Sequence, residues 1–351
     1  DAGENWTFLE NSEVDYTFTL AISPENPDII YSGYSPKPFQ NYGMIRMSED
    51  GGNSWKTSLK LENSDGITSV IIDPQNPNIL YAGNTGQKGE LWTSTDNGVN
   101  WHELNPSLNF TNIHVMESSL GNPNTIFGGV WGGGTYTTVD NGKNWQPLKN
   151  DPTISASAIL LNPNNQSEMY ISDRTAPKVY YTDNDGNSWE TIFDGCADYY
   201  RVLASAISPS NPKIVYISVF GLEGPFSGDV FRIENGISRK VTGELPRLPV
   251  GLVVDPNNSE VVFAISHAGG VFKTTNGGED WINLSTSESG LPDSDQVGYN
   301  MITISPFDPD TIFLLAGSDI TGYDLQHVGT TPNEMFTVYR STDSGLHWEN
   351  L

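Results

Sequence analysis

The sequence predicts an all-β fold, a seven-bladed β-propeller built from four-stranded antiparallel blades, and three observations carry this prediction. The apolar runs are short, rich in Ile, Val, Tyr and Phe, and bounded by Pro, Asn, Asp and Gly, which is typical of strands joined by tight turns. Two different turn sequences recur along the chain with a common period. We find no amphipathic helical pattern longer than two turns, so helical fold classes are disfavoured.

The first recurring sequence is Ser/Thr-x-Asp/Asn-x-Gly-x-x-Trp, which we name the turn motif. Complete copies lie at residues 48–55, 94–101, 138–145, 182–189, 274–281 and 341–348, and a clipped copy opens the chain. Its tryptophans, at positions 6, 55, 101, 145, 189, 281 and 348, are separated by 49, 46, 44, 44, 92 and 67 residues. The interval of 92 is two periods of 46, so one copy is missing, and we expect Asn235-Gly236 to form a tight hairpin in its place.

The second recurring sequence, which we name the Pro/Asn hairpin, is an apolar run, a Pro/Asn turn and a second apolar run that ends in an aromatic residue. The seven aromatic residues are Tyr31, Tyr81, Phe127, Tyr170, Tyr216, Phe263 and Phe313. The two repeats alternate, so each period contains four strands, which is typical of a propeller blade. Seven hairpins therefore predict seven blades, starting near residues 16, 67, 112, 154, 201, 249 and 299.

We expect residues 1–351 to form a single propeller domain in which residues 1–10 supply a strand that closes the ring against the last blade. One blade cannot bury both of its faces, so blades must stack to form a core. The clipped first motif leads us to expect that the chain is part of a longer protein, with further domains of that protein as possible partners.

The turn motif matches the Asp-box (BNR) repeat. Together with the Pro/Asn hairpin, it makes the chain resemble the Asp-box propellers of xyloglucanase-like glycoside hydrolases, sortilin-type luminal domains and photosystem II assembly factors. The resemblance covers nearly the whole chain and implies the fold. It leaves the function open, because these relatives do unrelated jobs.

We interpret the Asp and Asn of the turn motif as structural residues, because such side chains accept backbone N–H bonds within their own turn. These residues are Asp50, Asp96, Asp140, Asn184, Asn276 and Asp343. The two asparagines indicate that an acceptor suffices and a charge is not required. A metal-binding loop at residues 183–186 is the alternative, but it lacks the distal glutamate of a calcium loop. We expect neither a metal nor a cofactor.

The charge balance excludes several partners. With 17 Lys and Arg against 43 Asp and Glu, the formal charge is −26, so phosphate backbones and anionic membrane surfaces are repelled. No apolar run approaches the roughly 18 residues of a membrane helix. The single Cys196 excludes an intramolecular disulfide and a cysteine-based zinc site. We therefore expect neither nucleic-acid binding nor membrane insertion, and the acidic, Asn-rich chain favours a secreted, periplasmic or cell-surface location.

In the propellers that the chain resembles, ligands usually sit on the face that carries the second-to-third-strand turns and the interblade connections. Aromatic rings mixed with carboxylates on this face suit either sugars or protein partners, although the same rings could simply pack the loops. The candidate ligand residues are Tyr34, Phe39, Tyr42, Trp131, Tyr199, Tyr200, Phe220, Tyr299, Tyr323, Asp15, Asp198 and Asp319. Trp131 is the strongest candidate, because the flanking glycines leave its ring uncovered.

Two functional hypotheses follow. The first is a binding or scaffold module that recognises a glycan or a protein through its loop-rich face. The alternative is a glycoside hydrolase that acts on a β-glucan-type polysaccharide with paired carboxylates. Hydrolases of the resembled family place their acid and base on two facing propellers, and this chain holds only one. An assembly factor fits less well, because those relatives carry a basic patch and only 17 residues here are cationic.

Overall fold

The structure is a computed structural model of the whole chain. It describes residues 16–26, 28–35, 42–50, 54–86, 90–104, 113–119, 121–122, 124–153, 155–195, 198–222, 227–243, 245, 249–266, 269–286, 288–291, 298–305, 308–317 and 337–350. The expected closing strand at residues 1–10 lies outside this part of the chain and stays a prediction.

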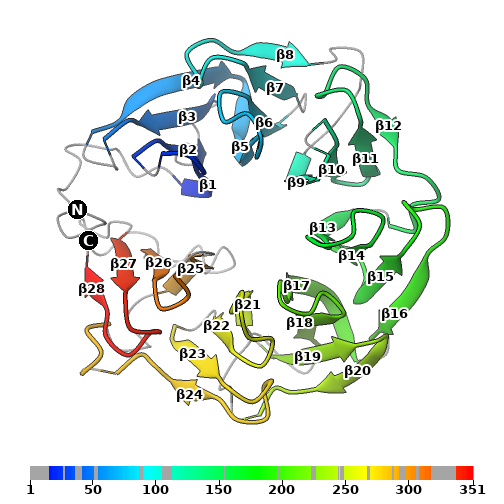
Figure 1. Cartoon of the computed structure of the whole chain (residues 1–351), viewed down its shortest axis with the longest axis vertical. Helices are drawn as coiled ribbons and strands as arrows, with labels where there is room; N and C mark the ends of the chain where they lie inside the picture. Colours follow the sequence, from blue (N-terminus) through cyan, green and yellow to red (C-terminus); the bar gives the residue numbers. More distant parts are fainter. Residues whose placement is uncertain are drawn as a thin grey trace. The chain divides into compact units, whose positions relative to one another are not determined.

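The described residues form twenty-eight strands in seven four-stranded antiparallel sheets, which are the blades of a seven-bladed β-propeller (Figure 1). The predicted fold class is confirmed. Within every blade, neighbouring strands are consecutive in the chain. The described residues contain no helix, and so none that could cross a membrane.

The strand bounds of blades 1 to 4 are β1 (Tyr16–Ile22), β2 (Ile30–Ser35), β3 (Tyr42–Ser48) and β4 (Lys56–Glu62); β5 (Ser64–Ile72), β6 (Leu80–Gly86), β7 (Leu91–Ser94) and β8 (His102–Leu104); β9 (Ile113–Ser118), β10 (Ile126–Val130), β11 (Gly134–Thr138) and β12 (Gln146–Pro147); and β13 (Ala156–Leu161), β14 (Met169–Asp173), β15 (Lys178–Thr182) and β16 (Glu190–Asp194). Those of blades 5 to 7 are β17 (Tyr199–Ile207), β18 (Ile214–Gly221), β19 (Gly228–Glu234) and β20 (Ile237–Lys240); β21 (Pro249–Val254), β22 (Val262–Ser266), β23 (Val271–Thr274) and β24 (Ile282–Asn283); and β25 (Gly298–Ile304), β26 (Ile312–Gly317), β27 (Thr337–Ser341) and β28 (Glu349–Asn350).

The chain divides into two compact units, which we describe separately. The N-terminal unit comprises residues 5–173 and 181–190, and the C-terminal unit comprises residues 1–4, 174–180 and 191–351. Blades 1 to 3 and the first two strands of blade 4 belong to the N-terminal unit, and blades 5 to 7 to the C-terminal unit.

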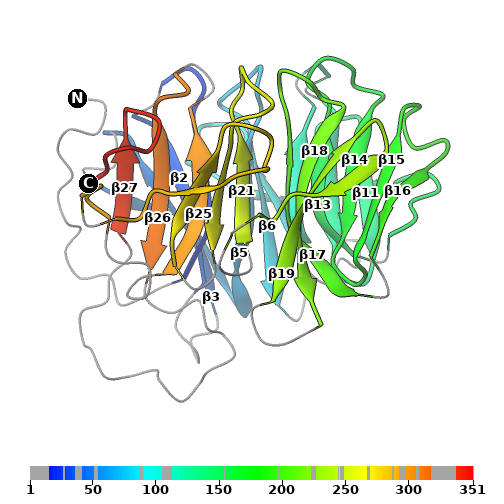
Figure 2. The same ribbon diagram turned by 90° about the horizontal axis from the view of Figure 1, so that it is seen from below.

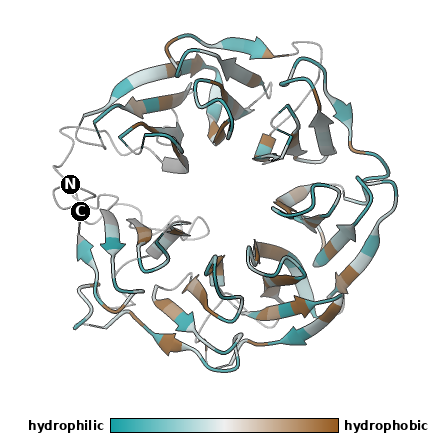
Figure 3. Ribbon diagram, viewed as in Figure 1, coloured by the Kyte–Doolittle hydropathy of each residue, from teal (hydrophilic) through white to brown (hydrophobic). Residues whose placement is uncertain are grey.

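The core of each unit lies between successive blades. The second strands β10, β14 and β22 are buried at every position. Hydrophobic residues accordingly concentrate on the strands, and hydrophilic residues on many of the turns (Figure 3). One cluster joins Ile45 and Leu59 of blade 1 to Ile67 of blade 2, and another joins Phe263 of blade 6 to Leu314 of blade 7.

The two repeats meet at one end of each blade. In blade 2 the N–H of Asn97, in the turn motif, donates to the carbonyl of Asn78 in the Pro/Asn hairpin at 3.0 Å, and Ser344 donates in the same way to Asp310 in blade 7. The second-to-third-strand turns and the interblade connections therefore lie at the opposite end, which we name the loop end. Figure 2 shows the strands running between the two ends.

The turn motif is closed by its own side chains. In all six copies the Asp or Asn Oδ1 accepts the N–H of the residue four positions later, at 2.8–3.0 Å. The Ser or Thr that begins each motif donates its hydroxyl to the same oxygen at 2.8–3.0 Å. Asn184 and Asn276 make the same two bonds as the aspartates, so the turn uses the oxygen and does not require the charge.

Several of the Pro/Asn hairpins pack their aromatic residue against the turn motif of the next blade. Tyr31 of blade 1 donates its hydroxyl to the carbonyl of Asn97 in blade 2 at 3.0 Å. A Cβ on Gly98 would lie 3.0 Å from the Tyr31 ring, and the φ of Gly98 is +76°. Gly345 of blade 7 lies against Phe263 of blade 6 in the same way. Only glycine meets both demands at these positions.

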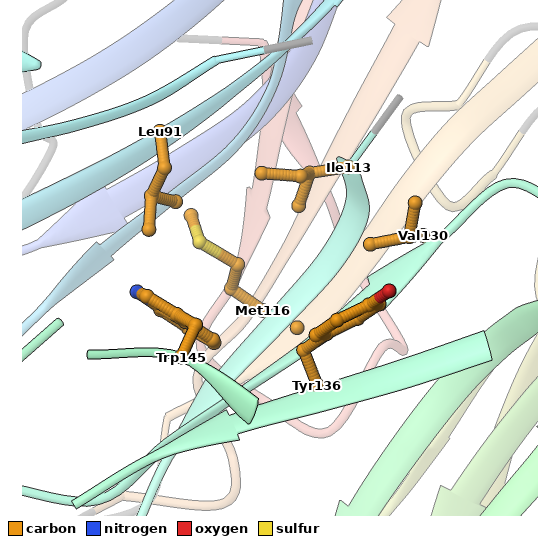
Figure 4. A pocket seen from close by; sticks show the side chains of 7 residues that line it. Leu91, Ile113, Met116, Val130, Tyr136 and Trp145 are labelled. Carbon is orange, nitrogen blue, oxygen red and sulfur yellow. The ribbon is translucent and has the colours of Figure 1, made fainter. Parts of the chain in front are cut away.

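The interface between blades 2 and 3 shows how tightly this arrangement packs. Side chains from both blades surround a small apolar gap that leaves no room for a water molecule, with Met116 in the middle of the group (Figure 4). Its lining residues are Leu91, Ile113, Met116, Gly128, Val130, Tyr136 and Trp145. This gap is a packing interface and offers no space to a ligand.

Blade 5 lacks the turn motif and uses a tight hairpin instead. Asn235 and Gly236 both have positive φ, at 51° and 78°, and Glu234 pairs with Ile237. This is the two-residue turn expected from an Asn-Gly sequence.

We expect the turn motif to make the thermal stability of the protein depend on pH. The N–H of Asn100, followed by its side-chain amide and the Ser94 hydroxyl, lowers the pKa of Asp96 to about 2. The stabilisation is therefore complete above the unfolded pKa of about 4 and is lost as the pH falls towards 2. Asp96→Ala should lower Tm at pH 7 more than Asp96→Asn does. The difference in Tm between wild type and Asp96→Asn should become smaller as the pH falls from 4 to 2.

Thermal unfolding followed by circular dichroism at several pH values measures this effect, and Thr95→Ala, at the exposed neighbouring position, is the control. An Asp96→Ala variant with an unchanged Tm would show that the turn does not need this acceptor.

Candidate functional site

The candidate ligand residues are only partly described. Phe39, Tyr323, Asp15 and Asp319 lie outside the described residues. In the N-terminal unit, Tyr34, Tyr42 and Trp131 lie at the loop ends of their blades. In the C-terminal unit, Asp198, Tyr199, Tyr200 and Phe220 lie at the loop end of blade 5. Among the described residues, no group of three or more His, Cys, Asp or Glu side chains could hold a metal ion.

Trp131 occupies the turn between β10 and β11 and keeps 48% of its surface exposed. The N–H of Gly133 donates to the carbonyl of Val130 at 3.2 Å and closes the turn. A Cβ on Gly132 would meet nothing within 4 Å, so the turn is open on the side of this glycine. The ring of His114, on β9, lies 4.8 Å from that of Trp131 at an interplanar angle of 51°, and the two rings form an aromatic pair at the loop end of blade 3.

The two tyrosines of blade 1 are each partly covered by a cation. The guanidinium of Arg46 lies 5.4 Å from the centre of the Tyr34 ring, and the ammonium of Lys60 lies 4.6 Å from that of Tyr42. Such contacts contribute roughly 0.5–1 kcal/mol at exposed sites. One face of each ring is therefore occupied by a cation of the same blade.

Tyr299 does not belong to a ligand surface. Its side chain is 0% exposed and packs in the cluster between blades 6 and 7 with Ile265 and Trp348. The pairing of β25 with β26 shifts register between Tyr299 and Met301. Such a bulge changes which face of the sheet a residue occupies, and it explains why the expectation of a ligand-facing ring is wrong.

Tyr199 is tied to its own blade. Its hydroxyl donates to Oδ2 of Asp229 at 2.6 Å, and its ring meets the edge of Phe231 at 5.7 Å. Burial would raise the pKa of Asp229, but the hydrogen bonds from Lys240, Tyr199 and Thr242 outweigh it and lower the pKa. These contacts fix the start of β17 and give Tyr199 a positioning role.

Tyr200 is the exposed aromatic residue of blade 5, with 59% of its surface accessible. It meets Phe220 edge-on at 6.4 Å. Leu222, immediately after β18, is also 59% exposed, and its N–H donates to the carbonyl of Asp198 at 3.3 Å. The guanidinium of Arg201 lies 5.9 Å from the centre of the Tyr200 ring. We name Tyr200, Arg201, Phe220 and Leu222 the blade 5 patch.

The structure adds residues that the candidate set did not include. His114 is one of five histidines scattered along the sequence. No local motif marks it, because its contact with Trp131 joins β9 to the β10–β11 turn. Glu117 on β9 is exposed at its surface, yet desolvation by the surrounding protein raises its pKa to about 7. Because this carboxyl still reaches water, its desolvation is partial. No local motif marks Glu117 in the sequence.

Comparisons with known proteins support the fold and leave the function open. No family model matches the chain. A curated xyloglucanase from Paenibacillus sp is 26% identical over 109 residues, which is 31% of this chain and 10% of that protein. The matched segment therefore spans about a tenth of the length of this relative.

Solved structures of similar fold include the GH74 xyloglucanase from Xanthomonas campestris, with a TM-score of 0.68 and 12% identity over 95% of this chain and 67% of that one. YCF48 bound to D1 peptide gives a TM-score of 0.61 and 17% identity over 86% of this chain and 90% of that one. Chaetomium thermophilum Sqt1 bound to the N-terminus of ribosomal protein L10 gives a TM-score of 0.64 and 14% identity over 93% of this chain and 84% of that one. At these identities the likeness shows a shared propeller fold.

The contrast between Tyr199 and Tyr200 can be tested directly. Tyr199→Phe removes a hydrogen bond to a half-buried carboxylate and should lower the free energy of unfolding by about 1–2 kcal/mol. Tyr200→Phe at the exposed neighbouring position should change it by less than about 0.5 kcal/mol. Urea unfolding of both variants measures the difference, and equal stabilities would contradict the positioning role of Tyr199.

Proposed function

We propose that the chain is an Asp-box propeller that acts as a binding module and holds a glycan against Trp131. The observation that carries the proposal is the 48% exposed indole in the β10–β11 turn, which is paired with the His114 ring. An exposed tryptophan is usually retained where it meets a partner, because leaving a large apolar ring in water is unfavourable.

The arrangement suits a sugar for two reasons. The flat, apolar face of an indole can stack on the C–H face of a pyranose ring, while polar groups beside it bond to hydroxyls. The turn that carries Trp131 is short and hydrogen-bonded, so little conformational entropy is lost when a ligand binds. The resemblance to xyloglucanases favours a β-glucan as the glycan. We place this module outside the cytoplasm, at the cell surface, in the periplasm or in the medium.

Trp131→Ala should weaken glycan binding by about 1–3 kcal/mol, the range of an aromatic hot spot, with little change in Tm. Titration calorimetry with xyloglucan oligosaccharides, mixed-linkage β-glucan and cellohexaose measures the affinity. Trp131→Phe should retain part of the binding, because a smaller ring remains.

Val139→Ala is the matched control, since Val139 is 60% exposed in the turn motif of the same blade, at the end opposite Trp131. Equal affinities for wild type and Trp131→Ala, or no binding to any of these glucans, would overturn the proposal.

A second candidate function is glycoside hydrolysis, and Glu117 is the observation that favours it. A carboxyl with a pKa near 7 can remain protonated and donate a proton to a leaving group. Hydrolysis also needs a second carboxylate at a defined separation from the first, which Glu117 alone does not supply. We therefore rank binding above hydrolysis.

A reducing-sugar assay decides between the two functions. The purified chain should release no more sugar from xyloglucan or β-glucan than a buffer blank. Release by wild type that falls at least a hundredfold in Glu117→Gln, with unchanged Tm, would favour the hydrolase. Release that survives in Glu117→Gln would point to a contaminating enzyme, which Trp131→Ala would leave unaffected.

A further inference from the structure

Arg201 on β17 is a cation without an ionic partner. No carboxylate lies within ion-pair distance of its guanidinium among the described residues, and its Nε is shut off from solvent without a hydrogen-bond acceptor. Its guanidinium lies 5.9 Å from the centre of the Tyr200 ring. Other arginines of the same unit are paired: Arg232 bonds to two glutamates at 2.7 and 2.8 Å.

Apolar surface surrounds this cation. Tyr200 and Leu222 each expose 59% of their surface, and Phe220 meets Tyr200 edge-on. Arg201 and Phe220 face each other in the β17–β18 pairing, so the charge and the apolar side chains belong to one site. The blade 5 patch thus combines a guanidinium with exposed aromatic and aliphatic side chains, the composition that is common at the centre of protein interfaces.

Hydrogen bonds within blade 5 hold the patch in place. Tyr199 anchors the start of β17 to Asp229 on β19, and Asp229 also accepts a hydrogen bond from Thr242 at 2.7 Å. The Leu222 N–H bond to Asp198 joins the two chain segments that carry the patch. A ligand therefore meets a preformed surface, which lowers the entropy lost on binding.

We propose that the blade 5 patch binds a peptide segment in which a carboxylate stands beside a bulky apolar side chain. The planar guanidinium can hold a carboxylate with two parallel hydrogen bonds. Tyr200 and Leu222 then bury the neighbouring apolar side chain, which gains from leaving water. An acidic polysaccharide would offer the carboxylate but no apolar group for Leu222 to cover. The proposal is independent of the glycan site, because the patch belongs to the other compact unit.

The negative charge of the chain restricts where an acidic peptide can bind. At a formal charge of −26, the protein as a whole repels anions, so an acidic peptide gains attraction only where an unpaired cation meets it. Binding should weaken as salt is added, because the Arg201–carboxylate contact lies at the surface.

A peptide array tests the proposal. Every peptide carries one central glutamate flanked by Phe, Leu, Ile or Trp, has blocked termini, and is paired with a twin in which glutamine replaces the glutamate. Glutamate peptides should bind labelled protein, and fluorescence anisotropy of the best pair should show at least a tenfold weaker affinity for the glutamine twin. Arg201→Gln should weaken the affinity for the glutamate peptide by a similar factor, and Leu222→Ala should weaken it threefold or more.

Arg239→Gln is the matched control, because Arg239 lies on β20 of the same blade and pairs with Glu279 at 2.9 Å. It should bind as wild type does. All variants are checked for unchanged Tm, and Leu222→Ala, at an exposed position, keeps the test valid should Arg201→Gln unfold. Equal binding of the glutamate and glutamine peptides would overturn the proposal. So would displacement of the peptide by polygalacturonate, or no saturable binding up to about 1 mM.

Discussion

The structure depends on one contact that recurs between several pairs of blades, the aromatic ring of a Pro/Asn hairpin packed against the glycine of the next turn motif. Tyr31 against Gly98 and Phe263 against Gly345 are two examples. The glycine removes the side chain that would keep the ring away, and its positive φ turns the chain around it. Because each ring belongs to one blade and each glycine to the next, folding of one blade stabilises its neighbour.

This contact leaves the loop ends of the blades free to vary. The turn-motif end is fixed by hydrogen bonds within the turns and to the hairpins, and its side chains are used in packing. The loop end lacks these two repeated motifs, and residues there differ from blade to blade. Blade 3 places an aromatic pair at that end, blade 1 places rings covered by cations, and blade 5 places an unpaired cation among apolar side chains. A common scaffold thus offers surfaces of different chemistry.

The propeller fold is shared with proteins of unrelated activity, so function has to be argued from these surfaces. The two loop-end sites differ in their chemistry. An exposed indole suits a sugar ring, whereas a guanidinium beside an exposed tyrosine suits an acidic, apolar peptide. The ligands of the two sites can be measured separately.

The sequence by itself determined the number of blades and the type of each turn, because turns and strand alternation are local properties. It also indicated the exposed position of Trp131, through the glycines around it. Only the tertiary structure decided which other rings face solvent. Tyr199, Tyr200 and Tyr299 all lie at the start of a first strand, yet Tyr200 is exposed and Tyr299 is buried. Bulges at these positions shift the side chains between faces, and a bulge is fixed by pairing with another strand, which the local sequence does not specify.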